Sequence, residues 1–253
     1  MLLSFLIDRF SLEGNAFFAA LIVGILLCMA IPYLLGSLNF AIIISKLFYH
    51  DDIRKYGSGN AGSTNMLRTY GKLPAAATLL LDMSKGAISV LIGFLILGDG
   101  ASAATQDLMW GTLGGTYLAG LFAVLGHMFP CFYRFKGGKG VATTAVVVLC
   151  TDPVVFLLLL AIFLIIVMGT KMISLGSVMC MLFYPVLLNR FSPERPEGIL
   201  ISFLIAALVI FMHRSNIKRI WVGKESKVSF KKHQKTPTKS ADAPEKKTET
   251  EGK

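Results

Sequence analysis

The sequence predicts an all-α protein, a polytopic transmembrane helical bundle of seven spans. Three observations lead to this prediction. Hydrophobic residues make up 54% of the 253 residues, whereas charged residues make up only 16%. Several apolar runs are long enough, at about 1.5 Å per helical residue, to cross about 30 Å of hydrocarbon. Short segments rich in glycine, proline or charge separate these runs, as expected for a chain that crosses a membrane repeatedly.

The first span is predicted at residues 16–38, where Pro32 should bend the last third of the helix. A polar segment follows, and the second span contains two charged residues, Asp82 and Lys85. The second to seventh spans are expected, in order, at residues 73–97, 113–129, 141–150, 154–168, 172–188 and 199–212. As an alternative, residues 141–168 form one kinked or re-entrant unit around Asp152-Pro153, which reduces the number of crossings to five or six.

The distribution of charge predicts the orientation of these spans. Cytoplasmic loops of membrane proteins carry an excess of lysine and arginine. With an odd number of crossings, one side receives the basic C-terminal tail and most of the basic residues between the predicted spans: Lys46, Arg54, Lys55, Arg68, Lys72, Arg134, Lys136, Lys139 and Lys171. The sequence therefore predicts a cytoplasmic C-terminus and an N-terminus outside. The loops on the outer side are expected to hold Asp99, Asp107, Asp152, Glu194 and Glu197.

The composition predicts two parts of the chain, a transmembrane domain at residues 1–221 and a disordered basic cytoplasmic tail at 222–253. The tail is rich in Lys, Thr, Glu, Pro and Ser, and it cannot bury enough apolar surface to offset its ordering entropy. Two interpretations of the tail stay open. Its lysines can associate electrostatically with anionic lipid headgroups, or the tail is a solvated extension without a specific role. The net charge is +10. In a membrane protein such an excess of basic residues reflects the orientation of the spans and contact with anionic lipid. We therefore expect membrane lipid as a partner and no nucleic acid.

A glycine-rich basic loop at residues 126–143 is the first candidate for chemistry. Gly137, Gly138 and Gly140 surround Lys139. Glycines can turn backbone N–H groups toward one anion, and the lysine adds a point charge, so the loop suits phosphate. The spacing differs from that of a Walker A loop, which argues against nucleotide hydrolysis. The alternative is a turn near anionic headgroups.

The second candidate is the polar loop at residues 56–68, which supplies glycines, short hydrogen-bonding side chains and Arg68. A guanidinium can hold two phosphate oxygens at once. Its neutral side chains include Ser58, Asn60, Thr64 and Asn65. The same residues also favour turns and helix caps, and on this segment alone the two interpretations are equally good.

The third cluster follows the last span, at residues 213–225. If the helix continues past residue 212, His213 and Asn216 share one face. The alternative is a positive stop with interfacial cations. Within the membrane, Asp82 and Lys85 are three residues apart on one helix and are expected to form a buried structural ion pair. Ser177, with Ser174, either faces the same cavity or packs as a small residue.

Three segments, YGSGNAGSTNMLR, GHMFPCFYRFKGGKGVAT and HRSNIKRIWVGKE, occur in this order between spans. They resemble the signature motifs of the bacterial acyl-phosphate:glycerol-3-phosphate acyltransferases, over about residues 16–225. The resemblance implies an enzyme of the bacterial inner membrane whose active site faces the cytoplasm. It implies transfer of a fatty acyl group from acyl phosphate to the sn-1 hydroxyl of glycerol 3-phosphate, giving lysophosphatidate and inorganic phosphate. It also implies that the enzyme uses no cofactor, no metal, no acyl-CoA and no acyl carrier protein, and acts in phospholipid synthesis.

By the same resemblance, Ser58, Arg68 and Lys139 bind phosphate, while His213 and Asn216 position glycerol 3-phosphate. The supporting residues implied are Asn60, Thr64 and Asn65 of the first motif, Gly137, Gly138 and Gly140 as backbone donors, and Ser177. No aspartate follows His127 or His213 at five residues, as it does in another large acyltransferase class. The general base is therefore left open between His213 and the phosphate of the substrate. Ser63 stands where the family pattern has alanine.

A transporter or lipid-phosphate binding protein is the alternative from another class, because such loops can hold an anion without chemistry. Inverted repeats would favour that alternative, but the two halves share only their hydropathy and the charges gather at one membrane face. We expect a monomer. Arg68→Ala and Lys139→Ala are each expected to abolish turnover without unfolding the protein.

Overall fold

The computed structural model describes residues 2–98 and 114–227. Every regular element in these ranges is helical. The α-helices are α1 (Leu2–Phe10), α2 (Gly14–Ser37), α3 (Phe40–Tyr49), α4 (Ser63–Thr69), α5 (Lys72–Leu97), α6 (Gly115–Met128), α7 (Val141–Thr151), α8 (Pro153–Thr170), α9 (Ile173–Phe191), α10 (Pro196–Met212) and α11 (Arg214–Trp221). Two 3-10 turns, Ile53–Lys55 and Cys131–Tyr133, lie in the connecting loops.

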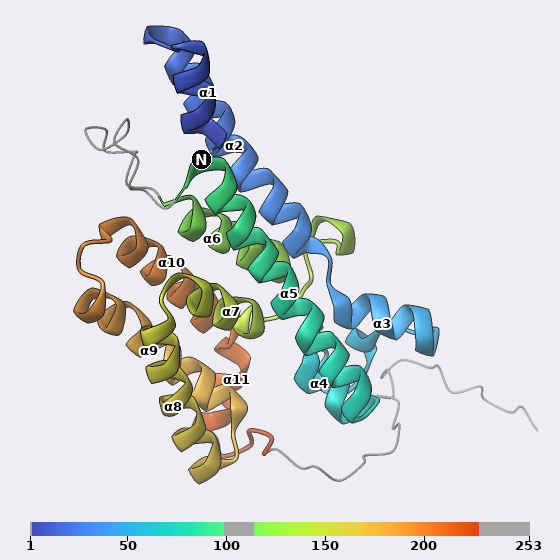
Figure 1. Cartoon of the computed structure of the whole chain (residues 1–253). Coiled ribbons are helices and arrows are strands. Elements are labelled where there is room, and N and C mark those ends of the chain that lie inside the picture. Colours follow the sequence, from blue (N-terminus) through green and yellow to red (C-terminus); the bar gives the residue numbers. More distant parts are fainter. Residues whose placement is uncertain (1, 99–113, 228–253) are drawn as a thin grey trace, which may run out of the picture.

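The long helices form two packed groups. Helices α2, α5 and α6 contact one another, α9 packs between α8 and α10, and α7 joins the two groups through α5 and α8 (Figure 1). Close approach of α5 and α6 depends on glycine, because a Cβ on Gly93 would lie 2.1 Å from the carbonyl oxygen of Gly115. Small residues at such crossings are typical of helix packing in membranes.

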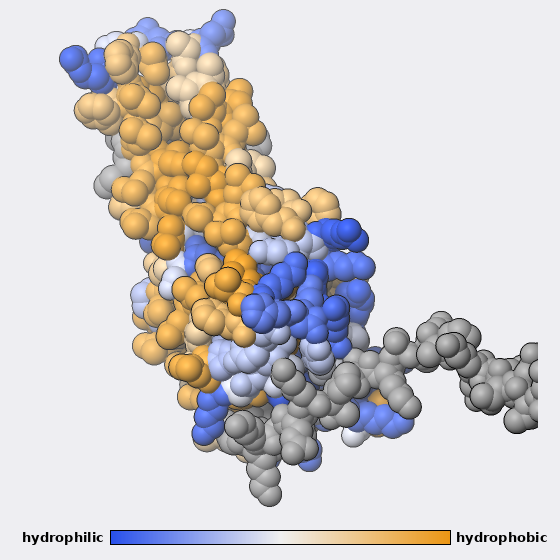
Figure 2. Space-filling model, turned by 90° about the vertical axis from the view of Figure 1, so that its right-hand side faces the viewer, coloured by the Kyte–Doolittle hydropathy of each residue, from blue (hydrophilic) through white to orange (hydrophobic). Residues whose placement is uncertain are grey.

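The surface of the bundle is apolar where lipid would surround it. Large exposed hydrophobic side chains include Leu80, Leu91, Leu157, Ile165, Leu200 and Phe203. Figure 2 shows a continuous apolar surface on the upper part of one face, with hydrophilic residues gathered on the lower part. A soluble protein would bury much of this area, so this distribution fits an integral membrane protein.

Among the described residues, five helices are long and apolar enough to cross a membrane, or six if α10 and α11, bent by 60°, count as one broken span. The predicted spans correspond in order to α2, α5, α6, α7, α8, α9 and α10. One reason why fewer than seven helices qualify is that α7 has 11 residues. At 1.5 Å per residue it reaches only about 16 Å. Seven crossings and their orientation stay predictions.

Helices α1, α3, α4 and α11 were not expected from the apolar runs. All four are short. Helix α3 begins in a stretch that the sequence analysis assigned to no span. Asn39 caps its N-terminus, because the Oδ1 of Asn39 accepts a hydrogen bond from the N–H of Ile42 at 3.1 Å. The predicted outer loop with Asp99 and Asp107, the start of the third span at 113, and tail residues 228–253 lie outside the described residues.

The two ends of the bundle differ in composition. At one end, Asp152 between α7 and α8 accepts hydrogen bonds from Tyr117 of α6 at 2.6 Å and from Ser192 after α9 at 2.9 Å. At this end Gly115, the first residue of α6, also bonds to Gly98, which follows α5. The opposite end carries α4 and α11, and there the three sequence motifs meet.

Candidate active site

A cavity of about 460 Å³ opens between α4, α5, α7, α8, α9 and α11. All three sequence motifs contribute to its lining. Of the predicted site residues, those that line it are Ser58, Asn60, Thr64, Asn65, Arg68, Lys139, Gly140, Ser177, His213 and Asn216. The coincidence of the three motifs at one site, which the sequence only suggested, is therefore confirmed.

Asn65 organises the first loop from within. Its Oδ1 accepts a hydrogen bond from the N–H of Ser58 at 3.0 Å, and its Nδ2 donates to the carbonyl oxygens of Ile53 at 3.2 Å and Tyr56 at 3.0 Å. The side chain is buried. Asn65 therefore fixes the loop that presents Ser58, and the polar groups of Asn65 are already used for this purpose.

The glycine loop uses its first backbone donors internally. The N–H of Gly137 donates to the carbonyl oxygen of Met128, and that of Gly138 to the carbonyl oxygen of His127, each at 3.1 Å. Neither glycine lines the cavity. The predicted role of Gly137 and Gly138 as backbone donors to phosphate is therefore wrong, because the end of α6 already accepts both hydrogen bonds. Gly140, at φ +79°, does line the cavity.

The second and third motifs are joined through a chain of hydrogen bonds. The Nζ of Lys139 donates to Oδ1 of Asn216, and Nδ2 of Asn216 donates to Oε1 of Glu225 at 2.7 Å. Ser174 donates to the same carboxylate oxygen at 2.7 Å, and Arg219 donates to Oε2 at 2.7 Å. Lys139 and Asn216 are thus held side by side, as expected of a shared site.

Glu225 is a residue of the cavity lining that the sequence prediction missed. The boundary predicted at residue 221 placed it in a disordered tail, but its carboxylate accepts hydrogen bonds from α9 and α11. The folded part therefore extends beyond that boundary. The signal was present in the third segment, which ends at this glutamate, and a single buried acid among cations is a common partner for them.

The rim of the cavity carries more cations than anions. The pKa of Lys139 is lowered to about 8, mainly by burial and also by the charges of Arg219 and Arg68, whereas Glu225 acts to raise it. Burial also lowers the pKa of Arg68. For Glu225 burial acts to raise the pKa, but hydrogen bonds from Asn216, Ser174 and Arg219 hold it below its usual value. The positive charge that is left over favours an anionic ligand.

His213 lies at the bend between α10 and α11 and is buried. Its Nδ1 lies 2.8 Å from the carbonyl oxygen of Val209. Because a carbonyl only accepts, Nδ1 carries the proton, and Nε2 of the neutral ring is left as an acceptor. His213 and Asn216 both line the cavity although the helix bends between α10 and α11, so the straight continuation considered from sequence was unnecessary.

Away from the polar rim most of the cavity lining is apolar, with Asp82, His127 and Thr144 as polar exceptions. Its inner walls include Leu79 and Met83 of α5, Val148 of α7, and a row on α8 comprising Phe156, Leu159, Leu160 and Phe163. Ser174 and Ser177 of α9 also line it, which confirms that both serines face the cavity. The hydroxyl of Ser177 donates to the carbonyl oxygen of Ile173 at 2.9 Å within its own helix.

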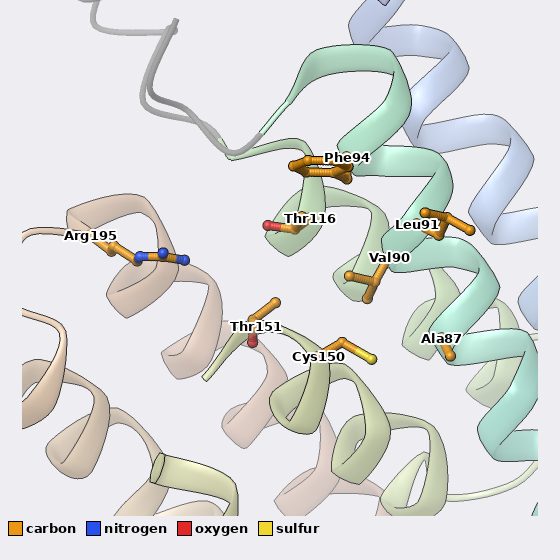
Figure 3. A pocket seen from close by; sticks show the side chains of 8 residues that line it. All are labelled: Ala87, Val90, Leu91, Phe94, Thr116, Cys150, Thr151 and Arg195. Carbon is orange, nitrogen blue, oxygen red and sulfur yellow. The ribbon is translucent and has the colours of Figure 1, made fainter. Parts of the chain in front are cut away.

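A second cavity, of about 320 Å³, lies at the other end of the bundle (Figure 3). Arg195 points into it, and Phe94, Leu91, Val90 and Ala87 of α5 form one wall. Arg195 is the one charged side chain among its described lining residues, and none of the three motifs contributes to it. The larger cavity is therefore the candidate active site.

An apolar helical bundle with a polar, cation-rich cavity at one end defines an integral membrane protein with a site for an anionic, partly apolar ligand. Comparison with known proteins narrows this class. The family model for glycerol-3-phosphate acyltransferase matches residues 26–223. The chain belongs to this family and is an acyltransferase.

Two relatives, both called glycerol-3-phosphate acyltransferase, illustrate the likeness. The protein of Thermoanaerobacter pseudethanolicus is 42% identical over 201 residues, covering 79% of this chain and 94% of the relative. That of Neisseria meningitidis serogroup C is 41% identical over 205 residues, covering 79% and 95%.

Crystal structures of PlsY (YgiH), an integral membrane glycerol 3-phosphate acyltransferase, have the same fold. Its glycerol 3-phosphate form superposes with a TM-score of 0.72 at 35% identity, covering 81% of this chain and 96% of PlsY. Its lysophosphatidic acid form gives a TM-score of 0.70 at 33% identity, with the same coverage. Family membership decides against the transporter that the sequence alone left open.

Proposed function

We propose that this enzyme transfers a fatty acyl group from acyl phosphate to the sn-1 hydroxyl of glycerol 3-phosphate, giving lysophosphatidate and inorganic phosphate for phospholipid synthesis. The observation that carries the proposal is one cavity with a rim of cations, Arg68, Lys139 and Arg219, above apolar walls. Each substrate presents a phosphate to the rim, and one of them also carries a fatty acyl chain that needs an apolar surface. The forms of the related PlsY fit this choice of acceptor and product.

In the proposed reaction the sn-1 oxygen attacks the acyl carbonyl carbon, the new C–O ester bond forms, and the bond between that carbon and the bridging phosphate oxygen breaks. Phosphate leaves with the electron pair, and the hydroxyl proton passes to a base. No covalent enzyme intermediate is needed, because acyl phosphate is already activated. Holding two anions in attack geometry supplies much of the catalysis, with Ser58, Arg68 and Lys139 as phosphate ligands.

Two groups can accept the proton. Nε2 of His213 is an acceptor beside the cavity, because Nδ1 is bonded to Val209. The phosphate of glycerol 3-phosphate is the other candidate. His213→Gln keeps a hydrogen-bonding side chain but cannot take a proton at neutral pH. A loss of more than about 100-fold in kcat, the scale of general-base catalysis, would favour His213, and a smaller loss would favour the substrate phosphate.

We further propose that the site faces the cytoplasm of the bacterial inner membrane and that the chain crosses seven times as a monomer. The excess of lysine and arginine at the motif end supports this orientation. In a variant without its native cysteines, Lys136→Cys should react with an impermeant maleimide in inside-out vesicles only, and Glu194→Cys in right-side-out vesicles only. The reverse pattern would invert the topology.

The donor is tested with the purified enzyme in lipid, by measuring phosphate release from palmitoyl phosphate with and without glycerol 3-phosphate. Palmitoyl-CoA is the control donor. Release that needs both substrates and yields lysophosphatidate is the expected result. Activity with the CoA donor alone would contradict the proposed leaving group.

A further inference from the structure

Three ionisable side chains meet inside the bundle, beside the cavity. Lys85 and Asp82 of α5 form an ion pair with 2.9 Å between Nζ and Oδ1, and each side chain is 3% exposed. This confirms the pair expected from sequence. His127 of α6 completes the cluster, with its Nδ1 3.1 Å from Nζ of Lys85 and 3.6 Å from Oδ1 of Asp82. Charged groups at membrane depth are costly, so such a cluster needs a reason.

Lys85 fixes the break between α2 and α3. Its Nζ donates to the carbonyl oxygens of Gly36 at 2.9 Å and Leu38 at 2.7 Å, the last turn of α2 and the residue after it. The next residue, Asn39, donates from Nδ2 to the carbonyl oxygen of Ala61 at 3.2 Å. Ala61 belongs to the first motif, so this lysine is connected to the loop that presents Ser58 and Asn60.

His127 fixes the glycine loop on the other side of the cluster. Its carbonyl oxygen accepts the N–H of Gly138, the residue before Lys139. A Cβ on Gly138 would lie 2.1 Å from Nε2 of His127 and 2.7 Å from the carbonyl oxygen of Ala61. The two loops therefore meet at this glycine, directly against the imidazole.

Stability alone does not account for the cluster, because apolar side chains of similar volume often replace a buried ion pair without loss. What the ammonium group supplies is direction: its three N–H donors have the carbonyl oxygens of Gly36 and Leu38 and the Nδ1 of His127 within hydrogen-bond distance, and the carboxylate of Asp82 balances its charge. Both of the loops that present Ser58, Arg68 and Lys139 to the cavity are attached to these groups.

We propose that Lys85, with Asp82 and His127, is a positioning residue that sets the separation between the two phosphate-binding loops. This inference rests on the proposed function, since it assumes that both loops hold phosphate. Lys85 itself does not line the cavity, although Asp82 and His127 do; it acts through Leu38 and Asn39 on the first motif and through His127 on the second. Because a displacement of about 1 Å can cost on the order of 100-fold in rate, loss of the ammonium group should affect both substrates together.

The test compares Lys85→Met with Ser89→Ala as a matched control. Ser89 is also buried on α5, one turn away, but its hydroxyl donates only to the carbonyl oxygen of Lys85 within the helix, at 2.8 Å. We expect KM for palmitoyl phosphate and KM for glycerol 3-phosphate to rise by about tenfold or more in Lys85→Met, with kcat/KM falling on the order of 100-fold. Both should stay near wild type in Ser89→Ala.

KM separates positioning from folding, because a smaller folded fraction lowers the apparent kcat and leaves KM unchanged. The double variant Asp82→Asn/Lys85→Met removes both charges, so it should unfold at a higher temperature than Lys85→Met yet keep the raised KM values. Normal KM values in either the single or the double variant would overturn the proposal. Lys139→Arg, measured beside them, tests the proposed function itself. If Lys139→Arg changes neither KM value, the assignment of the loops to phosphate fails. If Lys139→Arg raises at least one KM value and the Lys85 variants raise neither, only the inference about Lys85 fails.

Discussion

The cavity rim and the buried cluster beneath it are both polar networks, but they differ in how completely their charges are compensated. At the rim, the cations Lys139, Arg68 and Arg219 surround one carboxylate, that of Glu225. In the buried cluster, Lys85 has a carboxylate, an imidazole and two carbonyl oxygens around it. The difference supports the proposed function. Uncompensated positive charge at the rim suits the proposed anionic substrates, whereas the compensated cluster suits a role in holding the structure around them.

Loss of a rim cation should have the largest effect. Lys139→Ala removes a charge that holds substrate phosphate in the proposed function, and we expect kcat/KM to fall by roughly 100- to 1000-fold or more, as when a transition-state donor is removed. The melting temperature should fall only slightly, because Lys139 gives up one hydrogen bond, to Asn216, and no ion pair with a carboxylate. Arg68→Ala should behave in the same way.

Lys136→Ala is the matched control for Lys139→Ala. Lys136 is a lysine of the same loop, exposed and outside the cavity lining. Its loss should leave kcat/KM near wild type. Similar losses in the two variants would mean that general positive charge of the loop matters, and the distinction between a specific rim and its surroundings would fail.

Glu225→Gln tests the one anion of the rim and should have the next largest effect. Glutamine cannot accept hydrogen bonds from Asn216, Ser174 and Arg219 together, because one of its two terminal atoms is a donor. We expect a loss of about 1–3 kcal/mol in the free energy of unfolding together with reduced activity, seen as a lower melting temperature in detergent. Unchanged stability would show that Glu225 is not needed to hold α9 and α11 together.

The pH dependence of activity should report Lys139. Its pKa of about 8 lies below the usual value for lysine, so the charged form is lost as pH rises through this range. If binding needs the ammonium form, kcat/KM should fall above pH 8 by up to about tenfold per pH unit, since kcat/KM follows the groups of the free enzyme.

Lys139→Arg sharpens that pH prediction. A guanidinium keeps its charge beyond pH 12, so the alkaline fall of kcat/KM should disappear or move to higher pH in this variant. The plateau value of kcat/KM should be lower than in the wild type, because the guanidinium has a different shape from the ammonium group. An alkaline fall that stays at the same pH would assign it to another group.

Sequence could predict the parts of this comparison that are local. The apolar runs predicted α2, α5, α6, α8, α9 and α10 closely, and spacing along one helix predicted the Asp82–Lys85 pair. The contribution of His127 could not be predicted, because it lies 42 residues from Lys85 and only the packing of α5 on α6 brings them together. For the same reason the backbone donors of Gly137 and Gly138 were assigned to substrate: nothing in the loop itself indicates that the end of α6 accepts them.

Two serines one turn apart on α9 give the smallest and sharpest test. Both are buried and line the cavity, but Ser174 donates to the carboxylate of Glu225, whereas Ser177 donates to a carbonyl of its own helix. A hydrogen bond to a charged group contributes about 1.5–3 kcal/mol to stability and a neutral one about 0.5–1.5 kcal/mol, and only the bond from Ser174 helps to hold Glu225, which in turn holds Asn216 beside Lys139. Ser174→Ala should therefore lower kcat/KM by about tenfold or more, and Ser177→Ala by no more than about threefold. Equal effects of the two substitutions on kcat/KM would contradict this expectation. They would mean that Ser177 contacts substrate directly, as the family resemblance implied, despite its hydrogen bond within its own helix.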